Sequence, residues 1–220
     1  MTTIGIIGSG NIGSQLARAL TALGHDVVIA NSRGPASLAE LVAEVADSPR
    51  HGTLTAATVT EAATAGELVV LTIPLGKVPD LPRDLFDGRT VIDTCNYYPQ
   101  RDGQIPPLDD ESTTTVEWVA AQFPGGTFVK AFNHIPAREI TDHAQPTGTD
   151  RRRALTVHAD DADAKARVSA LIDAIGFDPL DGGSLADSWR IQRDTPGYGP
   201  RLTADELSEK LAAAKRYRDM

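Results

Sequence analysis

The segment that most constrains the fold is a glycine-rich stretch near the amino terminus, Gly8-Ser9-Gly10-Asn11-Ile12-Gly13. It follows the apolar run Ile4 to Ile7 and precedes apolar residues at helical spacing, so it predicts a turn from a buried strand into a helix. In that context G-x-G-x-x-G is typical of dinucleotide binding. Gly8 permits the tight turn, Gly10 lets the backbone approach a pyrophosphate, and Gly13 lets the helix pack on the strand. The helix amino terminus offers N–H groups to the anion.

The residues after the second predicted strand indicate which dinucleotide is bound. The chain reads Ala30-Asn31-Ser32-Arg33-Gly34-Pro35 where NAD-binding proteins usually present an Asp or Glu to the ribose 2′-hydroxyl. No carboxylate is present there. Ser32 and Arg33 can instead donate to a 2′-phosphate, and the helix expected near Pro35 points its positive end towards it. We therefore expect NADP(H); the alternative is that Arg33 is an ordinary exposed charge.

Alternation of short β-branched runs with helical patterns predicts an α/β fold with a doubly wound, mostly parallel sheet. We interpret residues 1–140 as an NADP-binding Rossmann domain and residues 141–220 as a small α/β extension packed on the sheet, followed by a tail. The prolines between Tyr97 and about Asp110 predict a loop. Strands are expected at Ile4–Ile7, Val27–Ile29, Thr53–Ala56, Leu68–Ile73, Val91–Ile92, Thr127–Phe132, Ala154–His158 and Phe177–Leu180, and a last helix from Thr203 to about Arg218.

Polar residues follow three of the central strands, as Thr72-Ile73-Pro74, Thr94-Cys95-Asn96 and Asn133-His134-Ile135-Pro136. Because open α/β sheets bind ligands at the carboxyl ends of their strands, we expect these segments to surround a nicotinamide ring. Cys95 has no basic or histidine neighbour in sequence and is interpreted as a small buried residue. For His134 three roles stay open: a ligand contact, a proton donor, or a hydrogen-bonded structural residue.

Two segments of the carboxyl-terminal half stand out. Arg151-Arg152-Arg153 precedes a strand and is expected to be a solvated charge run, although a contact with an anionic cofactor is the alternative. The segment from Trp189 to Tyr198 is expected to fold over the site or to pack on a partner subunit. The histidines show no metal-ligand spacing, so no metal site is predicted.

Composition narrows the class of protein. With 21 basic and 30 acidic residues the net charge is -9, which makes nucleic acid an improbable partner. No run approaches the roughly 18 apolar residues of a membrane span. The start of the chain lacks the layout of a secretion signal, and one cysteine makes no intrachain disulfide, so a cytoplasmic protein without membrane contact is expected.

Several of these segments together resemble a known family, the NADP oxidoreductases that use the deazaflavin coenzyme F-420. The dinucleotide-binding domain of the six-transmembrane metalloreductases is a more distant resemblance. The likeness spans about residues 1 to 190 and rests on Gly8 to Gly13, Leu23-Gly24-His25, Asn31-Ser32-Arg33, Leu71 to Pro74, Phe132 to Ala137 and Asp181 to Leu185. It implies that Ser9 to Ile12 contact the pyrophosphate, Ser32 and Arg33 the 2′-phosphate, Ile73 and Pro74 the nicotinamide, and Asn133 to Ala137 the meeting point of nicotinamide and deazaflavin.

The resulting hypothesis is an oxidoreductase that moves a hydride between NADP(H) and coenzyme F-420, with Asn133 and His134 as catalytic donors. Alternatives are a reductase of a flavin or of a small carbonyl or imine compound, and a non-enzymatic NADPH-sensing protein. The resemblance, together with Trp189, Ile191 and Tyr198 in a short polar stretch, suggests a homodimer. The predicted cofactor-binding residues are Gly8, Ser9, Gly10, Asn11, Ile12, Gly13, Asn31, Ser32, Arg33, Thr72, Ile73, Pro74, Asn96, Ile135 and Ala137.

Overall fold

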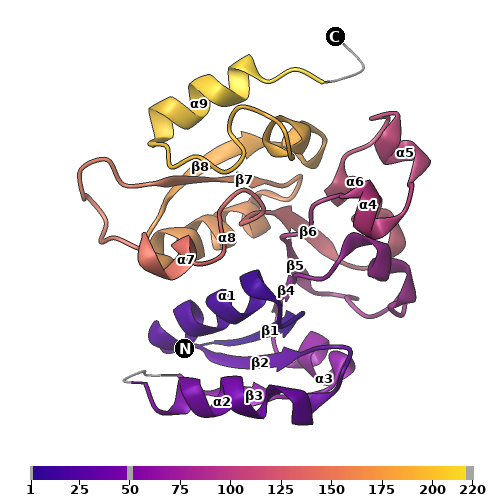
Figure 1. The fold of residues 1–220 in the computed structure, drawn as a ribbon, viewed down its shortest axis with the longest axis vertical. Coiled ribbons are helices and arrows are strands. Elements are labelled where there is room, and N and C mark those ends of the chain that lie inside the picture. Colours follow the sequence, from indigo (N-terminus) through magenta and orange to yellow (C-terminus); the bar gives the residue numbers. More distant parts are fainter. Residues whose placement is uncertain (1, 49–51, 217–220) are drawn as a thin grey trace.

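The structure, a computed structural model, describes residues 2–48 and 52–216 and is built on one eight-stranded sheet (Figure 1). The strand order is β3-β2-β1-β4-β5-β6-β7-β8. All neighbouring strands are parallel except β6 and β7, which are antiparallel. The strands are β1 (Thr3–Ile7), β2 (Asp26–Ala30), β3 (Leu54–Ala56), β4 (Leu68–Leu71), β5 (Thr90–Asp93), β6 (Thr127–Lys130), β7 (Ala154–His158) and β8 (Asp178–Gly183).

The order of the strands confirms the predicted doubly wound α/β fold. After β1 the chain moves outward to β2 and β3, then returns to place β4 on the other side of β1 and continues outward through β5 and β6. The connections that leave β1 and β4 therefore run in opposite directions. This reversal opens a crevice outside the carboxyl ends of the two strands, which is where such sheets bind ligands.

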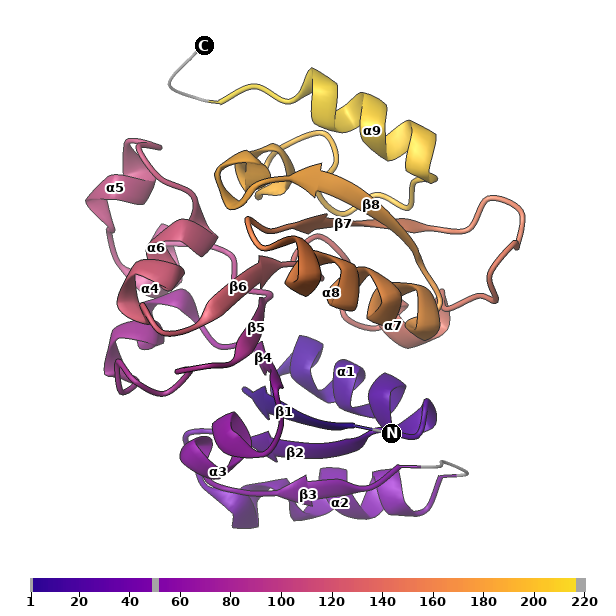
Figure 2. The same ribbon diagram turned by 180° about the vertical axis from the view of Figure 1, so that it is seen from behind.

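Helices cover both faces of the sheet (Figures 1 and 2). One core cluster joins one side-chain row of the strands to α1 (Asn11–Ala22), α2 (Ala39–Ala46), α7 (Glu139–Asp142) and α8 (Ala162–Ile175). A second cluster joins the other row to α3 (Val59–Thr64), α5 (Pro106–Asp109) and α6 (Thr115–Gln122). Three 3-10 helices, η1 (Pro35–Leu38), η2 (Leu75–Asp80) and η3 (Leu185–Ile191), lie in the connections of the described chain.

The extension predicted for residues 141–220 continues the same sheet. The boundary predicted at residue 140 falls inside α7, and β7 and β8 add two strands beside β6. Beyond β8 lies α9 (Ala204–Ala213), which packs Leu207 and Leu211 against Ala154 and Ile191 (Figure 1). As predicted, Thr203 caps this helix, but its last turn ends at Ala213; Arg218 lies outside the described residues.

Two details differ from the sequence prediction. The fourth and sixth strands end two residues early, at Leu71 and Lys130, and in the sixth strand Phe132 takes a left-handed φ of 58° that no strand residue adopts. The stretch from Tyr97 to Asp110, predicted to be a loop, contains α4 (Pro99–Asp102) and α5. A proline starts each of these short helices, because its fixed φ suits the first helical position, where no N–H partner is needed.

Candidate functional site

A crevice of about 410 Å³ lies at the carboxyl edge of the sheet, where the winding reverses. Its walls come from four places far apart in sequence: the turn from β1 into α1, the ends of β4 and β5, the turn after β6, and Tyr198 in the segment after η3. The lining residues are Gly10, Asn11, Ile12, Thr72, Ile73, Pro74, Thr94, Cys95, Asn96, Tyr98, Arg101, Asn133, Ile135, Ala137 and Tyr198.

The three glycines of the loop after β1 do not all occur for the same structural reason. Gly8 has a φ of 112°, and a Cβ there would overlap the carbonyl oxygen of Thr72. A Cβ on Gly13 would overlap the carbonyl oxygen of Gly8 and approach the Thr72 methyl to 2.9 Å. Gly10 has an ordinary φ of -69°, and a Cβ built on it meets nothing within 4 Å. The folded chain therefore requires Gly8 and Gly13, whereas nothing in the protein itself requires Gly10 to be a glycine.

Gly10 is also the N-cap of α1, and this helix start has no side-chain cap and no acidic residue in its first turn. The other long helices differ: Asp161 caps α8 and Thr203 caps α9 through hydrogen bonds to their first-turn N–H groups. Four N–H groups at a helix start need partners from outside the helix. The uncapped, positively polarised end of α1 at the crevice suits an anionic group such as a pyrophosphate.

Beside the glycine loop, the end of β2 forms a polar corner around Asn31. Its Nδ2 donates to Ser9 Oγ and to Ser37 Oγ, both at 3.0 Å, and its Oδ1 accepts from the Arg33 N–H at 2.9 Å. This ties the loop after β1 to the loop after β2. The Arg33 side chain is exposed and forms no ion pair with any residue that the structure describes. A free guanidinium therefore stands where a 2′-phosphate was predicted.

The opposite wall of the crevice is held by a chain of hydrogen bonds that starts at Asn133. Asn96 Nδ2 donates to the Asn133 backbone carbonyl at 2.8 Å and to the Tyr198 hydroxyl at 3.2 Å. The Tyr198 and Tyr98 hydroxyls are 2.9 Å apart. Asn133 Nδ2 donates to Asn96 Oδ1 at 3.3 Å and to the Ile191 carbonyl at 3.1 Å. Both amide hydrogens of Asn133 are thus used inside the protein, and its buried Oδ1 has no donor among the described residues.

Two arginines lie over the ring of Tyr98. The guanidinium of Arg101 is 4.8 Å from the ring centre and that of Arg193 is 5.3 Å away. Arg101 is fixed by two hydrogen bonds to Asp102, each 2.8 Å, and by one to the Asn96 carbonyl at 2.9 Å. Burial alone raises the pKa of Asp102, but hydrogen bonds from Arg101, Tyr98 N–H and Gly76 N–H outweigh it and lower that pKa below its usual value. Arg101 and Asp102 therefore form a fixed ion pair at this end of the crevice.

His134 does not line the crevice. Its buried ring points to the sheet, where Nε2 accepts from the Thr156 N–H at 3.1 Å. Burial, with Arg153 and His158 nearby, lowers the pKa of His134 to about 3, so the ring is neutral at physiological pH. Of the roles left open for His134, this geometry favours the hydrogen-bonded structural residue.

The expectation that the three consecutive arginines are solvated is wrong for two of them. Arg151 is exposed and pairs with Glu206 at 2.8 Å. Arg152 is 2% exposed and bonds to Asp173 at 2.6 Å and to Asp178 at 2.9 Å. Arg153 is fully buried, pairs with Glu139, and donates to the carbonyls of Gly199 and Pro200 at 3.0 and 3.3 Å. Their partners lie on α7, α8, β8 and the segment 199–200, which the sequence pattern does not reveal.

The segment from Trp189 to Tyr198 folds over the site of its own chain, one of its two predicted positions. Ile191 is buried in the core beside α9, Gly199 N–H donates to the His134 carbonyl at 3.1 Å, and Arg153 holds the next two carbonyls. These contacts place Tyr198 in the crevice wall. The apolar residues that suggested a partner surface are thus used within the chain, and the homodimer stays a prediction.

Cys95 is buried, as predicted, although it borders the crevice. Burial raises the pKa of its thiol well above the ordinary value, and Asp93 adds to that effect. Behind it, a buried ion pair joins Lys130 and Asp93 at 3.0 Å, and Lys130 also donates to the Cys95 carbonyl. A neutral thiol is a poor nucleophile, so we assign Cys95 no chemical role. Cys95 and the ion pair behind it support the wall of the crevice.

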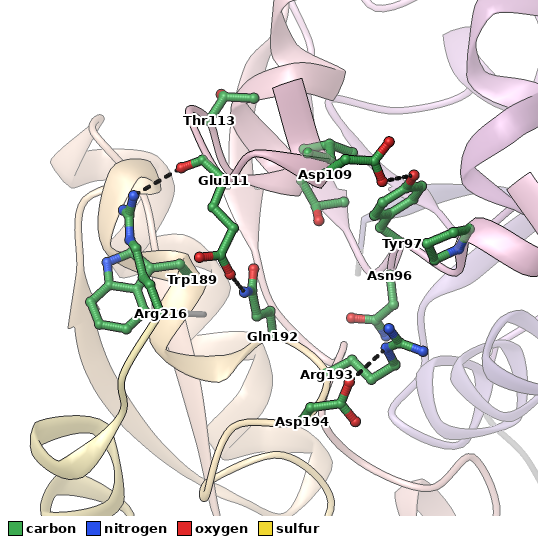
Figure 3. A pocket seen from close by; sticks show the side chains of 13 residues that line it. Asn96, Tyr97, Asp109, Glu111, Thr113, Trp189, Gln192, Arg193, Asp194 and Arg216 are labelled. Atoms are coloured by element: carbon green, nitrogen blue, oxygen red, sulfur yellow. Dashed lines mark hydrogen bonds and ion pairs between the residues drawn. The ribbon is translucent and has the colours of Figure 1, made fainter. Parts of the chain in front are cut away.

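A second, smaller cavity of about 180 Å³ adjoins the crevice on the far side of Asn96 (Figure 3). Figure 3 shows its polar groups bonded to one another. The Tyr97 hydroxyl donates to Asp109, the Gln192 amide donates to the Glu111 carboxylate, Arg216 donates to the Glu111 backbone carbonyl, and Arg193 forms an ion pair with Asp194. Across residues 2–48 and 52–216, no cluster of three or more histidine, cysteine or carboxylate side chains is placed to hold a metal ion.

The crevice brings together ten of the predicted site residues, from Gly10, Asn11 and Ile12 through the ends of β4 and β5 to Asn133, Ile135 and Ala137. Gly8, Ser9, Gly13, Asn31, Ser32 and Arg33 support or flank it, and His134 lies behind it. Sequence reasoning missed Tyr98 and Arg101 as lining residues, and it placed Tyr198 only as part of a tail. No local motif marks them, since they meet the other lining residues through the tertiary fold alone.

Comparison with known proteins agrees with this architecture. Residues 3–97 match the model of the family described as NADP oxidoreductase coenzyme F420-dependent. The resemblance predicted from the sequence is thereby confirmed over residues 3–97, the part of the chain that matches this NADP-dependent oxidoreductase family. The matched part contains the glycine loop, the polar corner at Asn31 and the ends of β4 and β5, and it stops at Tyr97.

Two solved structures extend the likeness over nearly the whole chain. The hypothetical protein SMa0349 of Sinorhizobium meliloti is 33% identical and superposes with a TM-score of 0.73, covering 93% of this chain and 94% of that one. A candidate F420-dependent NADP-reductase of Arthrobacter sp. FB24 is 25% identical with a TM-score of 0.68, covering 86% and 87%. The α/β fold is therefore shared beyond residue 97.

Among curated proteins, Metalloreductase STEAP3 of Rattus norvegicus is 29% identical over 191 residues, which is 86% of this chain. The chain spans only 35% of the length of that metalloreductase. In the part of the chain that the structure describes, no helix has both the length and the apolar character needed to cross a membrane.

Proposed function

We propose that this chain, which matches the NADP oxidoreductase family over residues 3–97, binds NADP(H) along the crevice and transfers a hydride to or from a second substrate at its Tyr198 end. When bound, NADPH supplies a hydride from C4 of its nicotinamide ring. The chain's own residues bind the dinucleotide, orient the two substrates and exclude water. Coenzyme F-420 is the second substrate we favour, because the family model and the Arthrobacter neighbour both name it.

The observation that carries the proposal is Gly10. Among the glycines that the structure describes, Gly10 combines an ordinary φ with open space where its Cβ would be. A residue that the fold does not force to be glycine is explained if a ligand lies against its backbone. The uncapped start of α1 beside it and the unpaired Arg33 at the next strand end indicate that this ligand carries a pyrophosphate and a 2′-phosphate.

Gly10→Ala separates this explanation from a structural one. In the free protein the methyl group meets nothing. Alanine restricts the unfolded chain but is a poorer N-cap residue than glycine, so the free energy of unfolding should change by no more than about 1 kcal/mol in either direction. NADPH affinity, measured by calorimetry, should fall by at least about 100-fold, since the methyl group would occupy the space of the pyrophosphate.

Gly13→Ala is the matched control in the same loop. Its Cβ would overlap the Gly8 carbonyl, so this variant should lose stability. The proposal would be wrong if Gly10→Ala bound NADPH as tightly as the unmodified chain.

A reductase of FMN or FAD is the second candidate, and the likeness to a metalloreductase favours it. A metal ion accepts one electron at a time, whereas a hydride carries two, so a flavin that releases electrons singly would be needed between them. Anaerobic mixing of the protein and NADPH with F-420, FMN or FAD distinguishes the candidates. The visible absorption of the true acceptor is lost at a rate proportional to the protein concentration, and that of the other two is unchanged.

A further inference from the structure

The hydroxyl groups of Tyr98 and Tyr198 form the one hydrogen-bonded phenol pair of the crevice wall. They come from positions 100 residues apart: Tyr98 directly precedes α4, and Tyr198 ends the segment that follows η3. Both side chains are half-buried and line the same crevice as Gly10 and Asn133.

The direction of the hydrogen bonds around the pair is fixed by Asn96. The Asn133 backbone carbonyl can only accept, so the group of Asn96 that faces it at 2.8 Å must be the amide nitrogen. The second hydrogen of that nitrogen is directed to the Tyr198 hydroxyl at 3.2 Å. Tyr198 therefore accepts one hydrogen bond from Asn96.

A count of hydrogens follows from this arrangement. The two phenols carry two O–H hydrogens, and the bond between them uses one, whichever tyrosine donates it. The structure gives the pair no other acceptor among the residues it describes. One O–H is therefore left to donate, at an end of the crevice that also holds the Arg101–Asp102 ion pair.

We propose, resting on the hydride transfer proposed above, that the Tyr98–Tyr198 pair is the hydrogen-bond donor to the second substrate. This assigns the class of substrate: a compound in which the atom that takes the hydride, a carbon or a flavin ring nitrogen, is doubly bonded or conjugated to an oxygen or nitrogen that can receive the displaced electron pair. The ring systems of a deazaflavin and of a flavin belong to this class, and so does a simple carbonyl compound.

The electron balance of the reducing direction shows where a donor is needed. The bond to hydrogen at C4 of NADPH breaks as NADPH is oxidised to NADP+, and a C–H bond, or an N–H bond in a flavin, forms at the acceptor atom. The π electron pair of the acceptor moves onto its bonded or conjugated oxygen or nitrogen. The free O–H of the pair donates to that atom while its negative charge develops, and the proton that completes the reduction comes from water. A donor placed at such an atom before the reaction acts mainly on the transition state.

The protonation of Tyr198 and the position of Tyr98 are both set by their surroundings. Burial and the hydrogen bond with Tyr98 raise the pKa of Tyr198, so its hydroxyl stays protonated. Asp102 accepts from the Tyr98 backbone N–H at 2.9 Å and holds Arg101 over the Tyr98 ring. Asn133, whose amide hydrogens are both used by Asn96 and Ile191, positions Asn96 and through it Tyr198.

The test is a comparison of Tyr98→Phe, Tyr198→Phe and the double variant. Each single variant leaves one hydroxyl with a free hydrogen, so turnover should fall only about 3- to 30-fold, and more for Tyr198→Phe, which removes the hydroxyl anchored by Asn96. The double variant has no donor and should lose about 100- to 1000-fold. NADPH affinity should stay within about twofold in all three, since the glycine loop anchors the dinucleotide.

Tyr97→Phe is the control. Tyr97 adjoins Tyr98 but its hydroxyl bonds to Asp109 and Gly103 outside the crevice. This variant should lose some stability and keep its turnover.

A second readout does not depend on turnover. Titration of F-420, of FMN and of a small conjugated ketone into the protein should shift the absorption spectrum of whichever compound binds, and the double variant should lose that shift. The pair is not the donor if the double variant keeps both the turnover and the shift of the unmodified protein. If the unmodified protein binds no NADPH, the proposed function is wrong. The spectral shift of the second substrate still tests the Tyr98–Tyr198 pair in that case.

Discussion

The two ends of the crevice are built in opposite ways. At the glycine loop, the ligand-facing groups are backbone N–H groups and a free side chain, Arg33. The hydrogen bonds that tie this loop to the end of β2 lie within the first 37 residues, and Thr72 packs against its glycines. At the Tyr198 end, the ligand-facing groups are side chains from four separate segments, supported from behind by buried charges such as Arg153 and Lys130. The glycine-loop end needs few long-range contacts, whereas the Tyr198 end is built from contacts between distant segments.

This difference teaches which end can change without loss of the fold. A loop whose geometry depends on glycines and one helix start binds the same phosphate groups wherever it occurs. A wall that depends on buried ion pairs tolerates little substitution, because removing one member of a pair leaves an uncompensated charge and destabilises the fold. A variant that damages one end of the crevice should therefore leave the function of the other end measurable.

The largest effect is expected from Arg153→Leu, which attacks the buried support of the Tyr198 end. Glu139 and the carbonyls of Gly199 and Pro200 lose their partner, and the free energy of unfolding should fall by about 3–5 kcal/mol. Tyr198 loses its position, so turnover should fall more than NADPH affinity. Denaturant unfolding and NADPH titration measure the two quantities.

The adjacent Arg151→Leu is the control for this variant. Arg151 is exposed and its bond to Glu206 should contribute no more than about 1 kcal/mol. Equal midpoints of unfolding for Arg153→Leu and the unmodified protein would show that the buried arginine does not support this end.

A smaller effect, confined to the other end, is expected from Arg33→Ala. Its guanidinium has no partner in the described protein, so stability should not change. NADPH affinity should fall by about 1.5–3 kcal/mol, the contribution of a charged hydrogen bond, and NADH affinity should stay the same. Calorimetry with both dinucleotides checks this, with the exposed Arg83→Ala as control; equal losses for NADPH and NADH would contradict a 2′-phosphate contact.

The last effect is smallest at neutral pH, grows only on acidification, and belongs again to the Tyr198 end. Burial lowers the pKa of His134 to about 3 and that of His158 to about 4, below the ordinary value of about 6.5 in the unfolded chain. The unfolded state therefore binds more protons between these values, and stability decreases as pH falls from about 6.5 towards 4. Each histidine contributes a slope of up to about 1.4 kcal/mol per pH unit.

His158→Leu isolates one of the two contributions. Both ring nitrogens of His158 are buried without partners among the described residues, so leucine should not destabilise the protein at neutral pH. Urea unfolding at several pH values should give the variant the shallower dependence. Parallel curves would place the pH dependence in other groups.

The glycine loop shows how far local sequence goes. Spacing alone predicted that Gly8 and Gly13 are required, although the folded chain requires them partly through contact with Thr72 on the next central strand end. It also predicted the strand, the turn and the helix, because each of these depends on residues only a few positions away. Capping boxes made the last helix predictable at its start for the same reason. The parallel direction of the first six strands followed from their alternation with helices, since parallel strands need crossover connections.

The sequence by itself determined a doubly wound sheet with a phosphate-binding turn, because that information is local and repeats with the period of each element. Only the tertiary structure decided that Arg152 and Arg153 are buried, that His134 faces the sheet, and that Tyr98 and Tyr198 meet over the crevice. Each of these depends on partners that the chain brings from about 10 to 100 residues away. No periodicity encodes such a meeting; it follows from how β7, β8 and the segment after η3 pack once the whole sheet has formed.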